Sequence, residues 1–295
     1  MLGEILALTC AAVWGVSVIL FKRSEAVSPL AMNLFKNTIG GLLLGATLFA
    51  TGGTVATDRS LEDWVRIVAS GVLGLAVSDT LFLEALKRLG AGMIAILDCI
   101  YAPLVALLSV VLLGEKLGSS FVVGAALVVG GLLIATTTAE GLKSAASVTS
   151  KQLGDVLLGV AAIAVMAVAV VIVKPVVDRS ELIEVTFTRV AIGAVAVGLS
   201  VLVFRKDRAE IFRVFVPQPT WRRLVPAAVL GTYVSMLLWL GGIKHTGAAT
   251  ASVLNQLSVL FTLVLARVWL KEPISRRKIA GGVASMAGAV IILVA

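Results

Sequence analysis

The sequence predicts an all-α integral membrane protein with ten transmembrane helices, arranged as two five-helix repeats of inverted topology. Three observations lead to this prediction. Long uncharged apolar runs fill the chain, a stretch of the first half recurs in the second, and each half holds an odd number of runs.

The composition is that of a membrane protein. Of the 295 residues, 59% are hydrophobic and only 14% are charged, whereas a soluble domain of this length needs more polar surface. The net charge of +8 is not a nucleic-acid signal, because most Lys and Arg lie in short gaps between apolar runs, where they can meet lipid headgroups. The two cysteines lie inside apolar runs and offer no disulfide framework.

Ten apolar runs are each long enough to cross a hydrocarbon core of about 30 Å as a helix. Helices are expected because backbone groups in lipid need internal partners, and the runs lack the alternation of a membrane barrel strand. The first run has no basic residue before it, unlike a signal peptide, so we expect it to be retained. In chain order the runs are 2–21, 29–51, 65–86, 89–113, 119–137, 153–173, 181–204, 224–243, 246–270 and 278–295.

The second half of the chain repeats the first. When the chain is shifted by 157 residues, 21 of the 71 positions in 64–134 are identical to those in 221–291 without a gap. The matches include Trp, Arg, Lys and Glu, which a shared apolar composition does not explain. The predicted division is a first repeat 1–137, a linker 138–152 and a second repeat 153–295.

Because five crossings leave the chain on the other side of the membrane, the second repeat is expected to be upside down relative to the first. In secondary transporters this design places a binding site near the midplane, between the halves. The odd-numbered loops hold 16 Lys and Arg and the even-numbered loops hold 6. By the positive-inside rule this count places both termini outside.

Three phrases carry a resemblance to a known family. The first run contains "AAVWGVSVILFK". The phrases "LLGEKL…G……G" and "WLKEPI…G……G" each begin at the end of the fourth run of a half and continue into its fifth run, with Glu115 and Glu272 at equivalent positions. Over nearly its whole length the chain resembles the EamA-type ten-helix transporters of the drug/metabolite transporter superfamily. The resemblance implies a substrate cavity between the halves, a peripheral fifth helix in each half, and termini inside, in disagreement with the loop count. The first run lacks the mid-helix glutamate of the small multidrug relatives, so their proton site is not carried over.

Three charged residues of the first half lie inside predicted helices at one depth. A charge at mid-helix costs about 2.5–3.5 kcal/mol on insertion scales, so it usually faces a cavity or a partner. The helical rise places Lys36, Asp79 and Asp98 roughly 10–14 Å below the same membrane face. These residues are expected to form a cluster.

The second half repeats the scaffold but changes the chemistry. The positions equivalent to Lys36, Asp79 and Asp98 hold Arg189, Met236 and Asn255, in that order, and Gln256 follows Asn255. The list of candidate binding residues therefore includes Arg189, Asn255 and Gln256 beside Lys36 and Asp98.

Two interpretations of these charges stay open. In one, a buried ion pair of Lys36 with an aspartate locks the helix packing. In the other, Lys36 or Arg189 holds a substrate carboxylate or phosphate, and Asp79 or Asp98 binds a proton or a substrate amine.

Other side chains are candidates for shaping the cavity. Two asparagines near Lys36 could add hydrogen bonds, and four aromatic residues could form its walls: Asn33, Asn37, Trp14, Tyr101, Tyr233 and Trp239. Pro103 removes one backbone hydrogen bond and is expected to kink the fourth helix.

The sequence therefore predicts a secondary active transporter of the cell membrane, an exporter of a small polar metabolite such as an amino acid or other carboxylate, working by alternating access. A multidrug or hydrophobic-cation exporter and a lipid flippase are the alternatives. A single His, no HExxH motif and no GxxxxGK[ST] loop argue against an enzyme, a metal, a cofactor or ATP-driven transport. The expected partners are a small-molecule substrate, membrane lipids and protons as coupling ion, without nucleic acid, in a monomer or homodimer.

Overall fold

The computed structural model is helical throughout the residues it describes. These are residues 1–113, 150–246, 248–272 and 275–294, together with seven residues between 123 and 134. No strand occurs among them, as the sequence predicts. The expected helix 119–137 and the linker 138–152 lie largely outside the described residues, so the count of ten helices stays a prediction.

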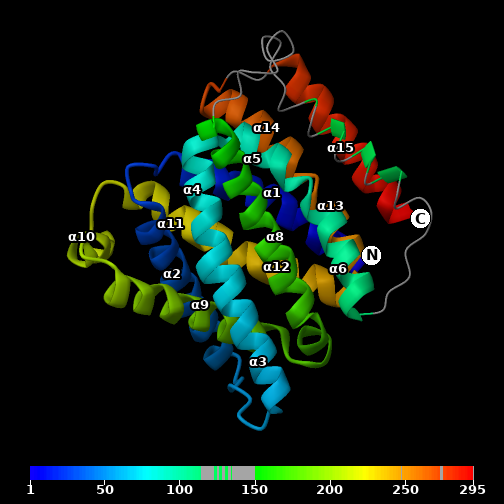
Figure 1. Cartoon of the computed structure of the whole chain (residues 1–295). Coiled ribbons are helices and arrows are strands. Elements are labelled where there is room, and N and C mark those ends of the chain that lie inside the picture. The colour runs from blue at the N-terminus through cyan, green and yellow to red at the C-terminus, as the bar shows by residue number, and fades with distance from the viewer. Residues whose placement is uncertain are drawn as a thin grey trace.

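The first half forms a series of long helical rods (Figure 1). Two are single helices, and two consist of consecutive segments. In chain order the elements are α1 (Leu2–Lys22), α2 (Pro29–Ala50), α3 (Leu61–Ser70), the π-helical η1 (Gly71–Ser78), α4 (Asp79–Leu89), α5 (Ala91–Asp98) and α6 (Tyr101–Leu113). Ser28 and Ser60 begin α2 and α3 as N-caps, accepting hydrogen bonds from the amides of Ala31 and Asp63.

The second half repeats this order of elements and adds two short helices, α10 and η2, and a last helix, α15. Its elements are α8 (Ser150–Arg179), α9 (Leu182–Phe204), the short α10 (Arg208–Phe212) and η2 (Arg213–Phe215), α11 (Trp221–Ala228), the π-helical η3 (Val229–Val234), α12 (Ser235–Thr246), α13 (Ala248–Asn255), α14 (Ser258–Trp269) and α15 (Arg276–Val294). The short helices α10 and η2 lie in a gap where the sequence predicted no helix.

Six helices among the described residues are long and apolar enough to cross a membrane. They are Leu2–Lys22, Leu61–Leu89, Ala91–Leu112, Gln152–Arg179, Leu182–Phe204 and Trp221–Thr246. α2 has a comparable length of 22 residues but carries Asn33, Lys36 and Asn37 in its first half. These polar residues within an apolar helix indicate a site beside α2.

The irregularities of the two halves coincide. The π-helical segments η1 and η3 overlap when the chain is shifted by 157 residues. The fourth rod of each half breaks at the same place, after Asp98 and after Asn255. Pro103 explains the first break, because its ring would clash with the carbonyl of Cys99 four residues earlier. The second half has Leu260 at the position of Pro103, so proline is not the common cause.

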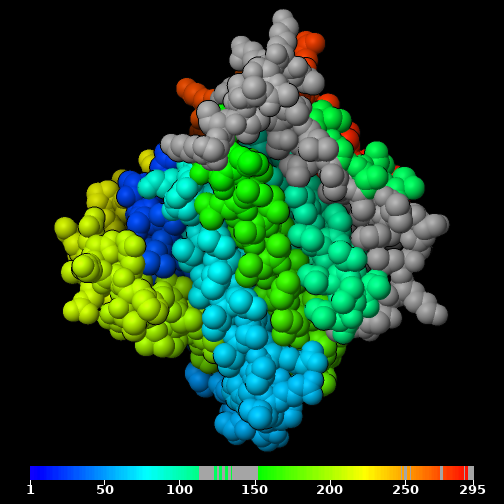
Figure 2. Space-filling model, in the orientation of Figure 1, coloured from blue at the N-terminus to red at the C-terminus, as the bar shows by residue number. Residues whose placement is uncertain are grey.

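The halves also meet through equivalent contacts. Ser17 of α1 donates a hydrogen bond to the carbonyl of Ala227 in α11 (3.0 Å), and Ser70 of α3 donates to the carbonyl of Ala169 in α8 (2.6 Å). α8 therefore lies along the third rod of the first half, where Figure 2 shows it between that rod and α6. α15 lies at the edge of the bundle, as expected for a fifth helix (Figure 1).

Glu272, from the repeated phrase of the second half, caps a helix of the first half. Its carboxylate oxygens accept hydrogen bonds from the backbone amides of Ala91 and Gly92 (both 3.0 Å) at the start of α5. Gly90 precedes them with φ of 82°, and a Cβ there would lie 3.1 Å from a Glu272 oxygen. The glutamate thus satisfies amides that a helix start leaves unpaired, and its charge suits the positive end of the helix dipole.

Candidate functional site

A cavity of about 110 Å³ lies between the two halves. A single water needs on the order of 10–15 Å³ by the same measure, so the cavity has room for a small molecule. Eight of the predicted site residues line it: Trp14, Lys36, Asp79, Asp98, Tyr101, Arg189, Trp239 and Asn255. The cavity is also lined by residues that no sequence pattern pointed to, namely Cys10, Ser78, Met166, Val170 and Ser235.

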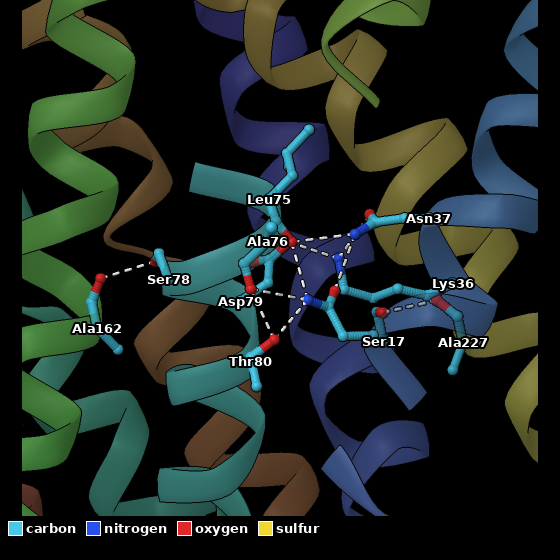
Figure 3. A network of polar contacts seen from close by, with 11 residues as sticks. Ser17, Lys36, Asn37, Leu75, Ala76, Ser78, Asp79, Thr80, Ala162 and Ala227 are labelled. Atoms are coloured by element: carbon cyan, nitrogen blue, oxygen red, sulfur yellow. Dashed lines mark hydrogen bonds and ion pairs between the residues drawn. The ribbon is translucent and has the colours of Figure 1, made fainter. Parts of the chain in front are cut away.

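Lys36 and Asp79 form a buried ion pair, as one of the two interpretations expects. The Lys36 Nζ lies 2.5 Å from the Asp79 Oδ2, and the two side chains are 5% and 8% exposed. Nζ also donates to the Asn37 side-chain oxygen at 3.2 Å. Figure 3 shows the pair beside the carbonyl oxygens of η1. Each charge therefore has its counter-ion within the first half.

Asn33 and Asn37 hold α2 against η1 and do not line the cavity. The Asn37 side-chain amide donates to the carbonyl of Leu75 (3.0 Å) and to the side chain of Asn33 (2.9 Å). Asn33 donates to Leu75 as well (2.9 Å) and to the hydroxyl of Thr80 (2.8 Å). These bonds satisfy backbone groups of a π-helical segment and fix the position of Lys36 at the cavity edge.

Arg189 is a buried cation without a counter-ion. It is 1% exposed, extends from α9 and donates from Nε to the Ser70 hydroxyl at 3.0 Å. Its Nη1 is buried and has no hydrogen-bond partner, and no acidic side chain in the described residues lies within ion-pair distance of it. The close approach of α9 depends on Gly71, where a Cβ would lie 2.9 Å from the Arg189 carbonyl.

Asp98 ends α5 at the break and faces the same cavity. Its backbone carbonyl accepts a hydrogen bond from the Gln256 side chain (3.2 Å). This bond joins the break after Asp98 in the first half to the break after Asn255 in the second. No hydrogen bond or ion pair to its carboxylate is found within the described part of the chain. Asp98 is thus separate from the Lys36–Asp79 pair, although the sequence places all three at one depth.

Within the part of the chain that the structure describes, three neutral polar groups of the cavity are also buried without a hydrogen-bond partner. They are the Tyr101 hydroxyl, the Ser235 hydroxyl and the side-chain oxygen of Asn255. Buried polar groups nearly always have a hydrogen-bond partner, so these groups indicate space that a polar ligand or water fills.

Two aromatic pairs line the cavity, and Phe82 of one pair and Trp239 of the other occupy equivalent positions in the repeat. The rings of Trp14 and Phe82 are 5.7 Å apart, and those of Tyr101 and Trp239 are 5.9 Å apart. Tyr233 lies outside the cavity lining, with its hydroxyl 2.8 Å from that of Thr47. Gln256 does not line the cavity either and acts through its bond to Asp98.

Apolar helices in two halves of like order, around a small cavity lined by both apolar and charged side chains, are the architecture of a multi-pass membrane protein. The chain matches the EamA-like transporter family over residues 1–137 and 153–294 and belongs to that family. It is therefore a membrane transporter of the drug/metabolite transporter superfamily with a small-molecule substrate, as the resemblance implied. Members of the family are transporters and not enzymes.

A solved crystal structure supports the fold. It shares 19% sequence identity with the chain at a TM-score of 0.75, covering 98% of this chain and 95% of that one. At that identity the likeness concerns the fold alone. No curated protein matches the chain.

Proposed function

We propose that the chain is a secondary active transporter that exports a small carboxylate-bearing metabolite by alternating access. The observation that carries this proposal is Arg189, a buried cation that faces the cavity and has no counter-ion among the described residues. A buried charge without a partner is costly, and a substrate carboxylate in the cavity would supply that partner. The guanidinium fork suits a carboxylate because it can donate two parallel hydrogen bonds.

Lys36 is the weaker candidate for the same role. Asp79 already neutralises it at 2.5 Å, and Asn37 takes a second of its hydrogen bonds. A substrate carboxylate would have to displace Asp79 to bind Lys36. We therefore assign Lys36 and Asp79 to the scaffold of the cavity wall, and Arg189 to substrate binding.

Alternating access is supported by contacts between the halves at both ends of the bundle. At one end, Arg59 pairs with Glu184 and Arg179 with Asp63, and the Arg59 and Glu184 side chains are buried. At the other end of α8, Arg88 lies 3.0 Å from Asp155. Two ion pairs at one end and one at the other thus join the halves, and they must break when the cavity opens there.

Proton coupling is proposed for Asp98 rather than Asp79. A proton on Asp79 would leave the Lys36 charge unpaired, whereas the Asp98 carboxylate has no cationic partner among the described residues. Asp98→Asn is then expected to carry substrate down its own gradient but not to respond to an imposed pH gradient. An Asp98→Asn protein that a pH gradient drives as well as wild type would remove Asp98 from this role.

The proposed function is tested by efflux from proteoliposomes. The vesicles are loaded with a mixture of amino acids, other carboxylates and lipophilic cations, and the compounds that leave are identified by mass spectrometry. Carboxylates are expected to leave, and Arg189→Gln is expected to slow them at least tenfold, since the anion partner is lost. The control is Arg205→Gln, which removes an exposed arginine paired with Asp207. Equal carboxylate efflux from wild type and Arg189→Gln would refute the proposal.

A hydrophobic cation is the second candidate, because aromatic faces attract cations and four aromatic rings line the cavity. Asp98 would attract such a cation as well, but Arg189 counts against it, since the cation would share the cavity with a second positive charge. In the same assay, efflux of the lipophilic cations alone would favour this candidate.

A further inference from the structure

One end of the bundle carries a concentration of positive charge. The segment 205–223, which joins α9 to α11 through α10 and η2, contains six Lys and Arg but only two acids, Asp207 and Glu210. Asp207 pairs with Arg205, and the other five cations have no acidic side chain of the described residues within ion-pair distance. These five are exposed, as is Arg23 just after α1. We call the six together the basic surface: Arg23, Lys206, Arg208, Arg213, Arg222 and Arg223.

The segment that carries most of the basic surface is packed against the bundle. Ile211 and Val214 are each 3% exposed. The Trp221 indole donates a hydrogen bond to the carbonyl of Val214 at 2.9 Å. The rings of Phe215 and Trp221 lie 5.6 and 5.5 Å from the ring of Phe35 in α2. The cations are therefore presented from a fixed backbone.

The same contacts bring cations from three parts of the chain together. Arg213 directly precedes the carbonyl-bearing residue of η2, and Arg222 directly follows the tryptophan that bonds to it. The Arg223 guanidinium donates to the backbone carbonyl of Arg23 at 3.1 Å, which joins α11 to the end of α1. Figure 1 shows α10 at the edge of the bundle, and Figure 2 shows this segment standing out at the left of the molecule. The cations thus form one continuous surface.

The basic surface lies where the lipid-facing side of α9 ends. Val195, Leu199, Val203 and Phe204 are 60%, 55%, 68% and 80% exposed. In a membrane transporter, apolar side chains so exposed along a long helix face the acyl chains of the bilayer. Arg205 directly follows Phe204, and α10 and η2, of five and three residues, are too short to cross a membrane. The segment is therefore placed at the level of the lipid headgroups.

The equivalent segment of the first half is not basic. The stretch 51–60 contains one acid, Asp58, and one cation, Arg59, which is buried in its pair with Glu184. That pair lies at the start of α9, whereas the basic surface follows the end of α9, at the opposite end of the bundle. The excess of exposed positive charge in these equivalent segments is thus confined to one membrane face.

We propose that the basic surface binds the phosphate headgroups of anionic lipids in one leaflet, and that the bound lipid stabilises the folded transporter. Each Lys or Arg near an anionic lipid adds to the attraction, and guanidinium groups donate paired hydrogen bonds to phosphate. Such a lipid places its acyl chains along the exposed apolar side of α9 while its headgroup meets the cations. A soluble anion or an acidic protein would use the charges alone. The proposal is independent of the substrate, so its failure would leave the proposed transport standing.

The experiment compares two lipids with the same acyl chains, anionic phosphatidylglycerol and zwitterionic phosphatidylcholine. Each is added to the purified protein in an uncharged detergent, and the melting temperature is measured over a range of lipid concentration. A ligand that binds the folded protein raises its melting temperature. Phosphatidylglycerol is expected to bind at least tenfold more tightly than phosphatidylcholine. The difference is expected to shrink as NaCl is added, because salt screens exposed charges.

A double variant tests the basic surface directly. Arg213→Gln/Arg222→Gln is expected to weaken binding of phosphatidylglycerol about tenfold and to leave the melting temperature without lipid nearly unchanged, since both side chains are exposed. The matched control Arg66→Gln/Lys174→Gln removes two cations at the opposite end of the bundle, each paired with an acid one turn away on its own helix. The control is expected to bind phosphatidylglycerol as wild type does.

The other outcomes overturn the proposal. Equal binding of the two lipids by wild type would refute a site for anionic lipid. An equal loss in the control variant would mean that net charge, and not the basic surface, attracts the lipid. Stabilisation by glycerol phosphate or by polyglutamate as strong as that by phosphatidylglycerol would assign the surface to a soluble anion or to an acidic protein instead. If Arg213→Gln/Arg222→Gln does not fold, the comparison of lipids and salt on wild type decides the question.

Discussion

Lys36 and Arg189 occupy equivalent positions in the two halves but have different surroundings. Lys36 is paired with Asp79 and hydrogen-bonded to Asn37, whereas Arg189 has the Ser70 hydroxyl and an unpaired Nη1. The two halves thus share a helical scaffold, but the second half has Met236 where the first has Asp79, the counter-ion of Lys36. The difference shows that a buried charge in this fold can serve stability in one half and remain available for a ligand in the other.

The largest effect is expected from Lys36→Met, which removes one partner of the buried pair. Asp79 would be left as an uncompensated buried charge, at a cost of about 3–5 kcal/mol. The double variant Lys36→Met/Asp79→Leu should recover most of that stability, because buried pairs are often replaceable by apolar residues. The measurement is unfolding in mixed micelles, with Arg189→Met as the comparison. Arg189→Met should show no comparable loss, and an equal loss would mean that Arg189 has an unrecognised structural partner.

The shared scaffold predicts equal effects for two equivalent glycines. A Cβ at Gly40 would lie 2.7 Å from the Thr232 Cβ, and one at Gly193 would lie 2.6 Å from the Leu75 Cβ. Gly40→Ala and Gly193→Ala are therefore both expected to destabilise by about 1–3 kcal/mol through overpacking. Gly154→Ala is the control, since its Cβ would meet nothing within 4 Å. A clear difference between the first two variants in thermal unfolding would show that the halves do not share this contact.

The sequence predicted the helical scaffold well because apolar runs and the duplication are properties of sequence alone. It predicted the end of the sixth run at 173, but α8 continues to Arg179. Lys174 and Asp178 extend the helix as a pair one turn apart, with Nζ and Oδ2 separated by 2.7 Å. The end of the apolar run therefore marks the end of the hydrophobic segment and not the end of the helix.

The site was predicted only in part, because depth along a helix follows from sequence but rotation about its axis does not. Lys36, Asp79 and Asp98 were placed at one depth, yet only Asp79 meets Lys36. Asn33 and Asn37 share a face with Lys36, but their partners are carbonyls of the π-helical η1, whose geometry has no signal in sequence. That Arg189 has a hydroxyl partner but no counter-ion among the described residues depends on the packing of both halves.

The last prediction removes the difference between Lys36 and Arg189 by giving Arg189 a counter-ion. Met236→Asp places a carboxylate at the position equivalent to Asp79, on the cavity wall. Because this carboxylate would compete with the substrate for Arg189, transport of the carboxylate is expected to fall about tenfold, which corresponds to roughly 1.4 kcal/mol. Stability should be retained, since each new buried charge has a partner. Met236→Asn is the control for polarity without charge, and transport is measured in the proteoliposome assay. If the Asp and Asn variants transport equally, the charge of Arg189 does not act on the substrate, and the two halves differ in packing rather than in chemistry.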